Sequence, residues 1–132
     1  MNLFEECIEA LGEHAKILGD DAAKKILDKF DEKFPLTSWG RIDWDKVSGE
    51  KIIMSSVDDI SPTLTKTRRN PSGLIYVIGS DPQIPIIEST LDNVLESFDD
   101  VEAVSPNSWI YCPSGKWIVE IYHDGEITLG LV

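Results

Sequence analysis

Apolar residues recur at helical spacing near the N-terminus, in two stretches separated by Gly19. In the first stretch they mark one face of an amphipathic helix that ends at this glycine; they are Phe4, Cys7, Ile8, Leu11, Ala15 and Leu18. In the second stretch, AAKKILDKFDEKF, the inward-facing positions are Ala23, Ile26, Leu27 and Phe30. Because Gly19 leaves only a short connection between the two helices, they are expected to form a helical hairpin.

The spacing of apolar residues between Pro35 and Gly73 indicates secondary structure less clearly. Residues 37 to 44 are expected to form a strand with Gly40, Ile42 and Trp44 on one face. The run KIIMSSV is expected to be a second strand. The stretch DDISPTLTKTRRNPSG is rich in turn-forming residues and is expected to be a long exposed loop.

The stretch from Glu88 to Ala103, ESTLDNVLESFDDVEA, combines helical spacing with strong acidity. Much of it is expected to be a helix, since the apolar residues at helical spacing are Leu91, Val94, Leu95 and Phe98. Glu88, Asp92 and Glu96 then follow one another at spacings of four, and such like-charge pairs each cost a few tenths of a kcal/mol. Folding alone does not require this arrangement, so a cationic partner is a candidate reason for it.

The C-terminal part of the chain carries the clearest strand pattern. SWIYC, KWIVEIYH and EITLGLV are β-rich runs separated by Pro113-Ser114-Gly115 and by Asp124-Gly125, the second being a turn that hairpins favour. They predict a three-stranded meander, which LIYVIGS at 74 to 80 is expected to join, with PIIES as a brief extended segment.

Helices at the start and strands at the end predict an α+β fold. We expect an N-terminal helical hairpin packed on one face of a mostly antiparallel sheet with a C-terminal three-stranded meander. The 132 residues suffice for one domain with a real core, so residues 1 to 132 are taken as a single domain. No apolar run is long enough to cross a bilayer, and the start MNLFEECIEA has acids where a signal peptide has basic residues, so a cytoplasmic location is expected.

The formal net charge of -12 is unevenly distributed. Residues 81 to 132 hold ten acids against Lys116 alone, whereas residues 1 to 80 hold fourteen acids against eleven bases. This composition disfavours direct binding of nucleic acid, which requires Lys and Arg, and of an acidic membrane surface. It favours a basic protein partner, although solubility alone is an alternative reason for the acidity.

Candidates for catalysis are few, and no metal or cofactor is expected. His123, Asp124 and Glu126 surround a predicted hairpin turn and are interpreted as exposed polar groups. Cys7 and Cys112 lack basic neighbours and are interpreted as packing residues. Paired carboxylates such as Asp43 with Asp45 are too numerous to single out a site, and no nucleotide-binding, hydrolase or metalloprotease motif occurs.

Tryptophan is the other candidate for partner binding, because it is enriched at interface hot spots. Trp109 and Trp117 lie on adjacent predicted strands and are expected in the core. Trp39 is expected to be partly exposed, and it shares a predicted strand face with Arg41 and Asp43. The candidate partner-binding residues are therefore Glu88, Asp92, Glu96, Asp99, Asp100, Trp39 and Asp43.

Three parts of the chain carry a resemblance to a known family. MNLFEECIEALGE, TSWGRIDW and especially VEAVSPNSWIYCPSGKWIVEIYHDGEITLG resemble the immunity proteins of bacterial contact-dependent growth inhibition and related polymorphic toxin systems. The resemblance implies a cytoplasmic inhibitor that binds the C-terminal toxin domain encoded beside it, as a monomer in a 1:1 complex. Such toxins are often nucleases with basic grooves, which an acidic surface can occupy in place of phosphates.

Two other functions stay open on the sequence. One is a small acidic adaptor or regulatory domain unconnected with toxins, and the absence of a toxin gene immediately upstream would support it. The other is a carboxylate-based enzyme, which requires two or three acids buried together in a pocket.

Overall fold

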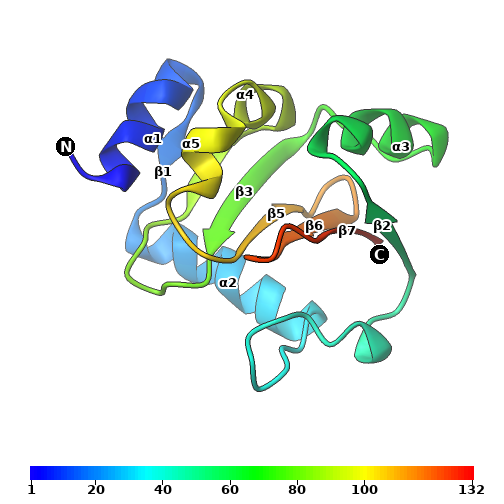
Figure 1. Cartoon of the computed structure of the whole chain (residues 1–132). Helices are drawn as coiled ribbons and strands as arrows, with labels where there is room; N and C mark the ends of the chain where they lie inside the picture. The colour runs from blue at the N-terminus through cyan, green and yellow to red at the C-terminus, as the bar shows by residue number, and fades with distance from the viewer.

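A seven-stranded antiparallel sheet forms the middle layer of the molecule in the computed structural model, which describes residues 1–132 (Figure 1). Its strands are β1 (Lys16–Ile17), β2 (Glu50–Met54), β3 (Leu74–Gly79), β4 (Ile87–Thr90), β5 (Ser108–Cys112), β6 (Trp117–Ile121) and β7 (Ile127–Leu131). They are arranged in the order β1-β4-β3-β5-β6-β7-β2, and every neighbouring pair is antiparallel.

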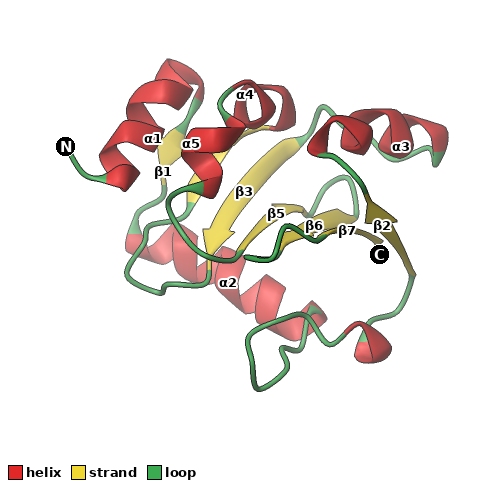
Figure 2. Cartoon of the chain, in the orientation of Figure 1, coloured by secondary structure: helices red, strands yellow, loops and turns green.

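Helices cover both faces of this sheet (Figure 2). The α-helices are α1 (Leu3–Leu11), α2 (Asp20–Lys33), α3 (Ile60–Lys66), α4 (Leu91–Glu96) and α5 (Phe98–Glu102), and the 3-10 helices are η1 (Gly12–His14), η2 (Trp44–Lys46) and η3 (Val57–Asp59). One face packs against α1, α3, α4 and α5, whereas α2 and the following loop pack against the other. None of the helices is long and apolar enough to cross a bilayer.

The C-terminal meander is confirmed and forms the most buried part of the sheet. Every residue of β5, β6 and β7 is buried, because both faces of these strands are covered. Gly125 has a φ of 93° in the turn between β6 and β7, a conformation that favours glycine. Trp109 and Trp117 are 3% and 0% exposed, as expected for core residues. The α+β fold class is therefore confirmed.

Both predicted N-terminal helices form, but the prediction that they pack together as a helical hairpin is wrong. The first helix ends at Leu11 because Gly12 takes a φ of 68° and closes it by donating its N–H to the Ile8 carbonyl. The chain then forms β1 at the edge of the sheet and crosses to the other face. Leu18 consequently packs with α2 rather than with Leu11.

Two further local predictions are corrected between α2 and β3. Residues 37 to 44 form a turn and not a strand: the Thr37 N–H donates to the Arg41 carbonyl at 2.7 Å, and Leu36 and Ile42 make only an isolated bridge. The expected long loop contains α3, in which Ile60 and Leu64 are buried at a spacing of four. Pro62 is tolerated there because the first turn of a helix does not use its N–H groups.

The prediction of one acidic helix over most of residues 88 to 103 is also wrong. Glu88 lies in β4, where it pairs with Lys16 on one side and Tyr76 on the other, and α4 starts only at Leu91. Thr90 caps α4 by accepting the Asn93 N–H at 3.3 Å, as expected for a Ser or Thr at this place. The chain breaks at Ser97 before α5, so only Asp92 and Glu96 keep the spacing of four.

Gly130 on β7 allows the Trp44 ring to lie directly on the sheet. A Cβ at this position would lie 2.6 Å from Trp44 Cζ3, closer than real contacts allow. We expect Gly130→Ala to lower the free energy of unfolding by about 1–3 kcal/mol, because the added methyl overpacks a buried contact. Urea denaturation measures this change. An unchanged midpoint and slope would show that Trp44 does not pack against β7.

Candidate partner-binding surfaces

Three neighbouring helices on one face of the sheet carry most of the net charge. Helices α1, α4 and α5 hold eight of the twenty-four acids and none of the twelve Lys and Arg residues, so they carry -8 of the net -12. All eight acidic side chains are exposed; this acidic face comprises Glu5, Glu6, Glu9, Asp92, Glu96, Asp99, Asp100 and Glu102.

Helices α4 and α5 lie beside α1 (Figure 1), and hydrogen bonds hold them against its end. The Asn93 amide donates to the Leu11 carbonyl at 3.1 Å, and the Ser97 hydroxyl donates to the Ala10 carbonyl at 3.3 Å. These bonds satisfy carbonyls that the end of a helix leaves without partners. The acids of α1 and those of α4 and α5 are thus brought together although they are far apart in the sequence.

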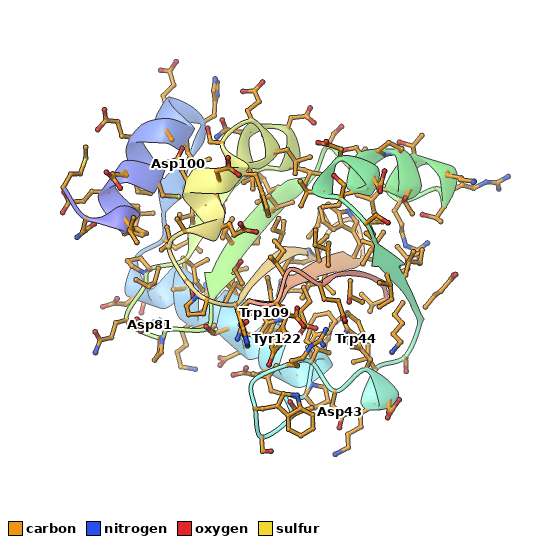
Figure 3. The ribbon with its side chains drawn as sticks, in the orientation of Figure 1. Asp43, Trp44, Asp81, Asp100, Trp109 and Tyr122 are labelled. Atoms are coloured by element: carbon orange, nitrogen blue, oxygen red, sulfur yellow. The ribbon has the colours of Figure 1, made fainter.

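Four of the seven predicted partner-binding residues lie on the acidic face: Asp92, Glu96, Asp99 and Asp100. Glu88 does not, because on β4 it faces the α2 side, beside Tyr76. Burial, and then the neighbouring Glu88 carboxylate, raise the pKa of Tyr76 above its usual value. Trp39 and Asp43 lie in the loop between α2 and β2, whose Ile42 packs on the α2 side. Figure 3 shows Asp43 there.

The loop that carries Trp39 and Asp43 is fixed by one buried carboxylate, Glu120 on β6. Glu120 is 1% exposed. Its carboxylate accepts five hydrogen bonds, which form the Glu120 network; the donors are Arg41 Nε at 3.3 Å, Arg41 Nη2 at 3.2 Å, Trp44 Nε1 at 3.2 Å, the Ile42 N–H at 2.7 Å and Trp109 Nε1 at 3.1 Å. A buried charge with this many donors is fully compensated.

Arg41 connects this network to the turn between β6 and β7. Its Nη2 also donates to Glu126 at 2.7 Å, and its guanidinium carbon lies 4.4 Å from the centre of the Tyr122 ring. Burial opposes the charged form of Arg41, but Glu126 and Glu120 outweigh it and raise its pKa above the usual value. Figure 3 shows Trp44, Trp109 and Tyr122 gathered on this side of the sheet.

Sequence reasoning missed the Glu120 network, although the sequence holds a signal for it. Glu120 is the one charged residue in the otherwise apolar run WIVEI, and strands of this kind are buried on both faces. A buried carboxylate needs a cationic or hydrogen-bonding partner. Arg41 in GRIDW, between two tryptophans, was a candidate for this role.

Both cysteines are free thiols in the core. Cys7 and Cys112 are both 0% exposed, and burial, followed by the charge of Asp100, raises the pKa of Cys7 to about 11. No group of three or more His, Cys, Asp or Glu residues is placed to hold a metal ion. His123 is exposed and lies 3.1 Å from the Asn107 side chain, beside the turn.

Removing the charge of Glu120 is expected to destabilise the fold. Glu120→Gln should lower the free energy of unfolding by about 3–5 kcal/mol, since it breaks a buried ion pair and replaces an acceptor by an amide group that donates. Glu126→Gln is the matched control, because Glu126 also contacts Arg41 but is 38% exposed, and its loss should cost under about 1 kcal/mol. Urea denaturation of both variants tests this, and equal losses would contradict it.

The cysteines should be unreactive in the native protein. A rise of the Cys7 pKa from 9.0 to about 11 leaves about 100-fold less thiolate at a given pH below 9, and burial slows access further. At pH 8 we expect native Cys7 to react with a thiol-specific disulfide reagent at least about 100-fold more slowly than after unfolding in urea. If Cys7 reacted equally fast in the native and the unfolded protein, it could not be a buried packing residue.

A comparison with protein families identifies the chain. No curated protein matches the sequence. The model of the CdiI immunity protein family, EcoliA0-like, matches residues 1–130, and so covers the helices of the acidic face, the loop that carries Trp39 and all of the sheet except Leu131. This match confirms the resemblance seen in the sequence: the chain belongs to the EcoliA0-like family of CdiI immunity proteins of contact-dependent growth inhibition.

Proposed function

We propose that this chain binds the toxic C-terminal domain encoded beside it and neutralises that domain through the acidic face. The observation that carries the proposal is the segregation of charge: -8 of the net -12 lies on three neighbouring helices without a single Lys or Arg. Solubility requires a net charge but not this segregation. A cationic partner relieves the repulsion and is attracted over a distance.

The toxin that fits this face best is a nuclease. Nucleases bind a polyanion and therefore carry Lys and Arg along the substrate groove. Carboxylates spaced along α4 and α5 would occupy such a groove in place of phosphates. We propose a 1:1 complex with the monomeric inhibitor in the cytoplasm, where a nuclease meets its substrate. In this function the chain performs no chemistry, which agrees with its family.

The acidic face is expected to determine the association rate. Replacing Asp92 and Asp99 by Asn and Glu96 by Gln should slow association with the purified toxin domain about tenfold at low salt and flatten the salt dependence. The free protein should keep its thermal stability within about 1 kcal/mol, since these side chains are exposed. Stopped-flow association over a range of salt, with thermal melts, measures both quantities.

The matched control has the same change in net charge on the opposite face. Asp21→Asn, Asp31→Asn and Glu32→Gln change three exposed acids of α2 and should leave the association rate within about twofold. Equal slowing by the two triple variants would show that total charge, and not the acidic face, attracts the toxin. Lack of binding by the wild-type chain would contradict the proposed function itself.

A further inference from the structure

Trp39 is presented to solvent on a rigid loop. Its side chain is 66% exposed, yet the backbone around it is ordered by hydrogen bonds. Gly40 closes the turn with a φ of 87° and donates its N–H to the Thr37 carbonyl at 3.1 Å. The Glu120 network anchors the loop at Arg41, directly after this turn. An exposed tryptophan whose backbone is already held by hydrogen bonds loses less entropy on binding than one on an unstructured loop.

A groove of about 240 Å³ lies beside Trp39, at the edge of the sheet formed by β2. Its apolar wall includes Trp39 and Ile53, the latter 60% exposed on β2. Its polar wall includes the carboxylates of Asp43, Asp45 and Glu126. We call this feature the Trp39 groove.

Thr128 is one of the residues that line the Trp39 groove, and its hydroxyl makes no hydrogen bond within the protein. Thr128 is 1% exposed and lies on β7 directly opposite Glu120. Its Oγ1 is buried without a protein partner. Buried hydroxyls are normally hydrogen-bonded, and an exception on the wall of a groove points to a partner that arrives from outside.

The charge of the groove favours a cation. Arg41 lies in its wall, but it already forms ion pairs with Glu120 and Glu126. Lys51 is the other basic residue in the wall, against the three carboxylates of Asp43, Asp45 and Glu126. The Nζ atom of Lys46 lies 3.6 Å from Asp43 Oδ2, and the Lys46 side chain is exposed.

The turn between β6 and β7 connects the Trp39 groove with the acidic face. Tyr122, at the start of this turn, lies under Arg41 and also lines a depression together with Glu102 of α5. Glu126, at its end, lines the Trp39 groove. In Figure 3, Tyr122 lies between Asp100 and Asp43. One partner can therefore contact both surfaces around this end of the sheet.

We propose that the Trp39 groove receives an arginine or lysine side chain of the toxin domain. Its cation lies over the ring of Trp39 and against Asp43 and Asp45, and one of its N–H groups donates to Thr128 Oγ1. The inference rests on the proposed function, because it takes the toxin domain as the partner. It adds a second contact that holds the complex together after the acidic face has attracted the toxin.

The first test removes the exposed ring. Trp39→Ala should raise the Kd for the purified toxin domain about 30-fold, mainly through faster dissociation, and leave the salt dependence of association unchanged. Leu74→Ala is the control, since Leu74 is also exposed, at 52%, but lies on β3 away from the groove. It should change the Kd less than about twofold. Equal Kd values for the two variants would overturn the proposal.

The second test asks whether the occupant is basic. Asp45→Asn should raise the Kd about threefold or more at low salt, with a smaller effect at high salt. Asp58→Asn is the matched control, because both residues are exposed and lie in the first turn of a 3-10 helix. Equal Kd values for these two variants would overturn the assignment of a basic occupant.

The two tests separate this inference from the proposed function. If the wild-type chain binds the toxin domain tightly and Trp39→Ala binds it equally well, the groove proposal fails and the proposed function stands. If the wild-type chain does not bind, the proposed function fails. Circular dichroism melts of Trp39→Ala should match the wild type, because the ring lies mostly in solvent.

Discussion

The carboxylate of Glu120 is the interaction on which the α2 side of this protein depends. It lies on β6, between β5 and β7, and receives donors from β5 and from the loop that follows α2. This loop has only an isolated bridge of its own, so Glu120 gives it the fixed shape that a strand would otherwise provide. A well-packed apolar pair in the same place can be equally stable, so we interpret the ion pair as a device that specifies one loop conformation.

The two faces of the sheet carry different candidate binding surfaces. On one face, short helices carry acids and no bases, and their positions are set by side chains such as Asn93 that bond to the end of α1. On the other face, the Glu120 network holds an exposed tryptophan beside a groove. We propose that the first face attracts the toxin domain and that the second face retains it.

Much of the fold could be predicted from the sequence where local pattern and tertiary packing agree. The meander follows from apolar runs and the Asp124-Gly125 turn, and β3 from LIYVIGS. The misses have two physical causes. Ala15 and Leu18 continue a helical spacing, but the positive φ of Gly12 ends the helix. Glu88 also fits a helix, but non-local pairing with β1 and β3 makes it a strand residue.

The candidate surfaces could be predicted only in part, because they join segments that are distant in the sequence. The acids of α4 and α5 stood out as one stretch, whereas those of α1 join them only through the packing of the helices. Trp39 stood out as an exposed tryptophan, and its 66% exposure confirms this. The groove beside it includes β2 and β7, so no local pattern could indicate it.

We propose that the acidic face and the Trp39 groove together bind the toxin domain. The most direct measurement is amide hydrogen exchange of the chain, alone and in complex with the toxin domain. In the complex we expect slower exchange in α4, in α5 and in residues 37 to 46, and unchanged exchange in α3, which lies on neither surface. Protection concentrated on α3 and the following residues 67 to 73, with none in α4, α5 or the Trp39 loop, would contradict it.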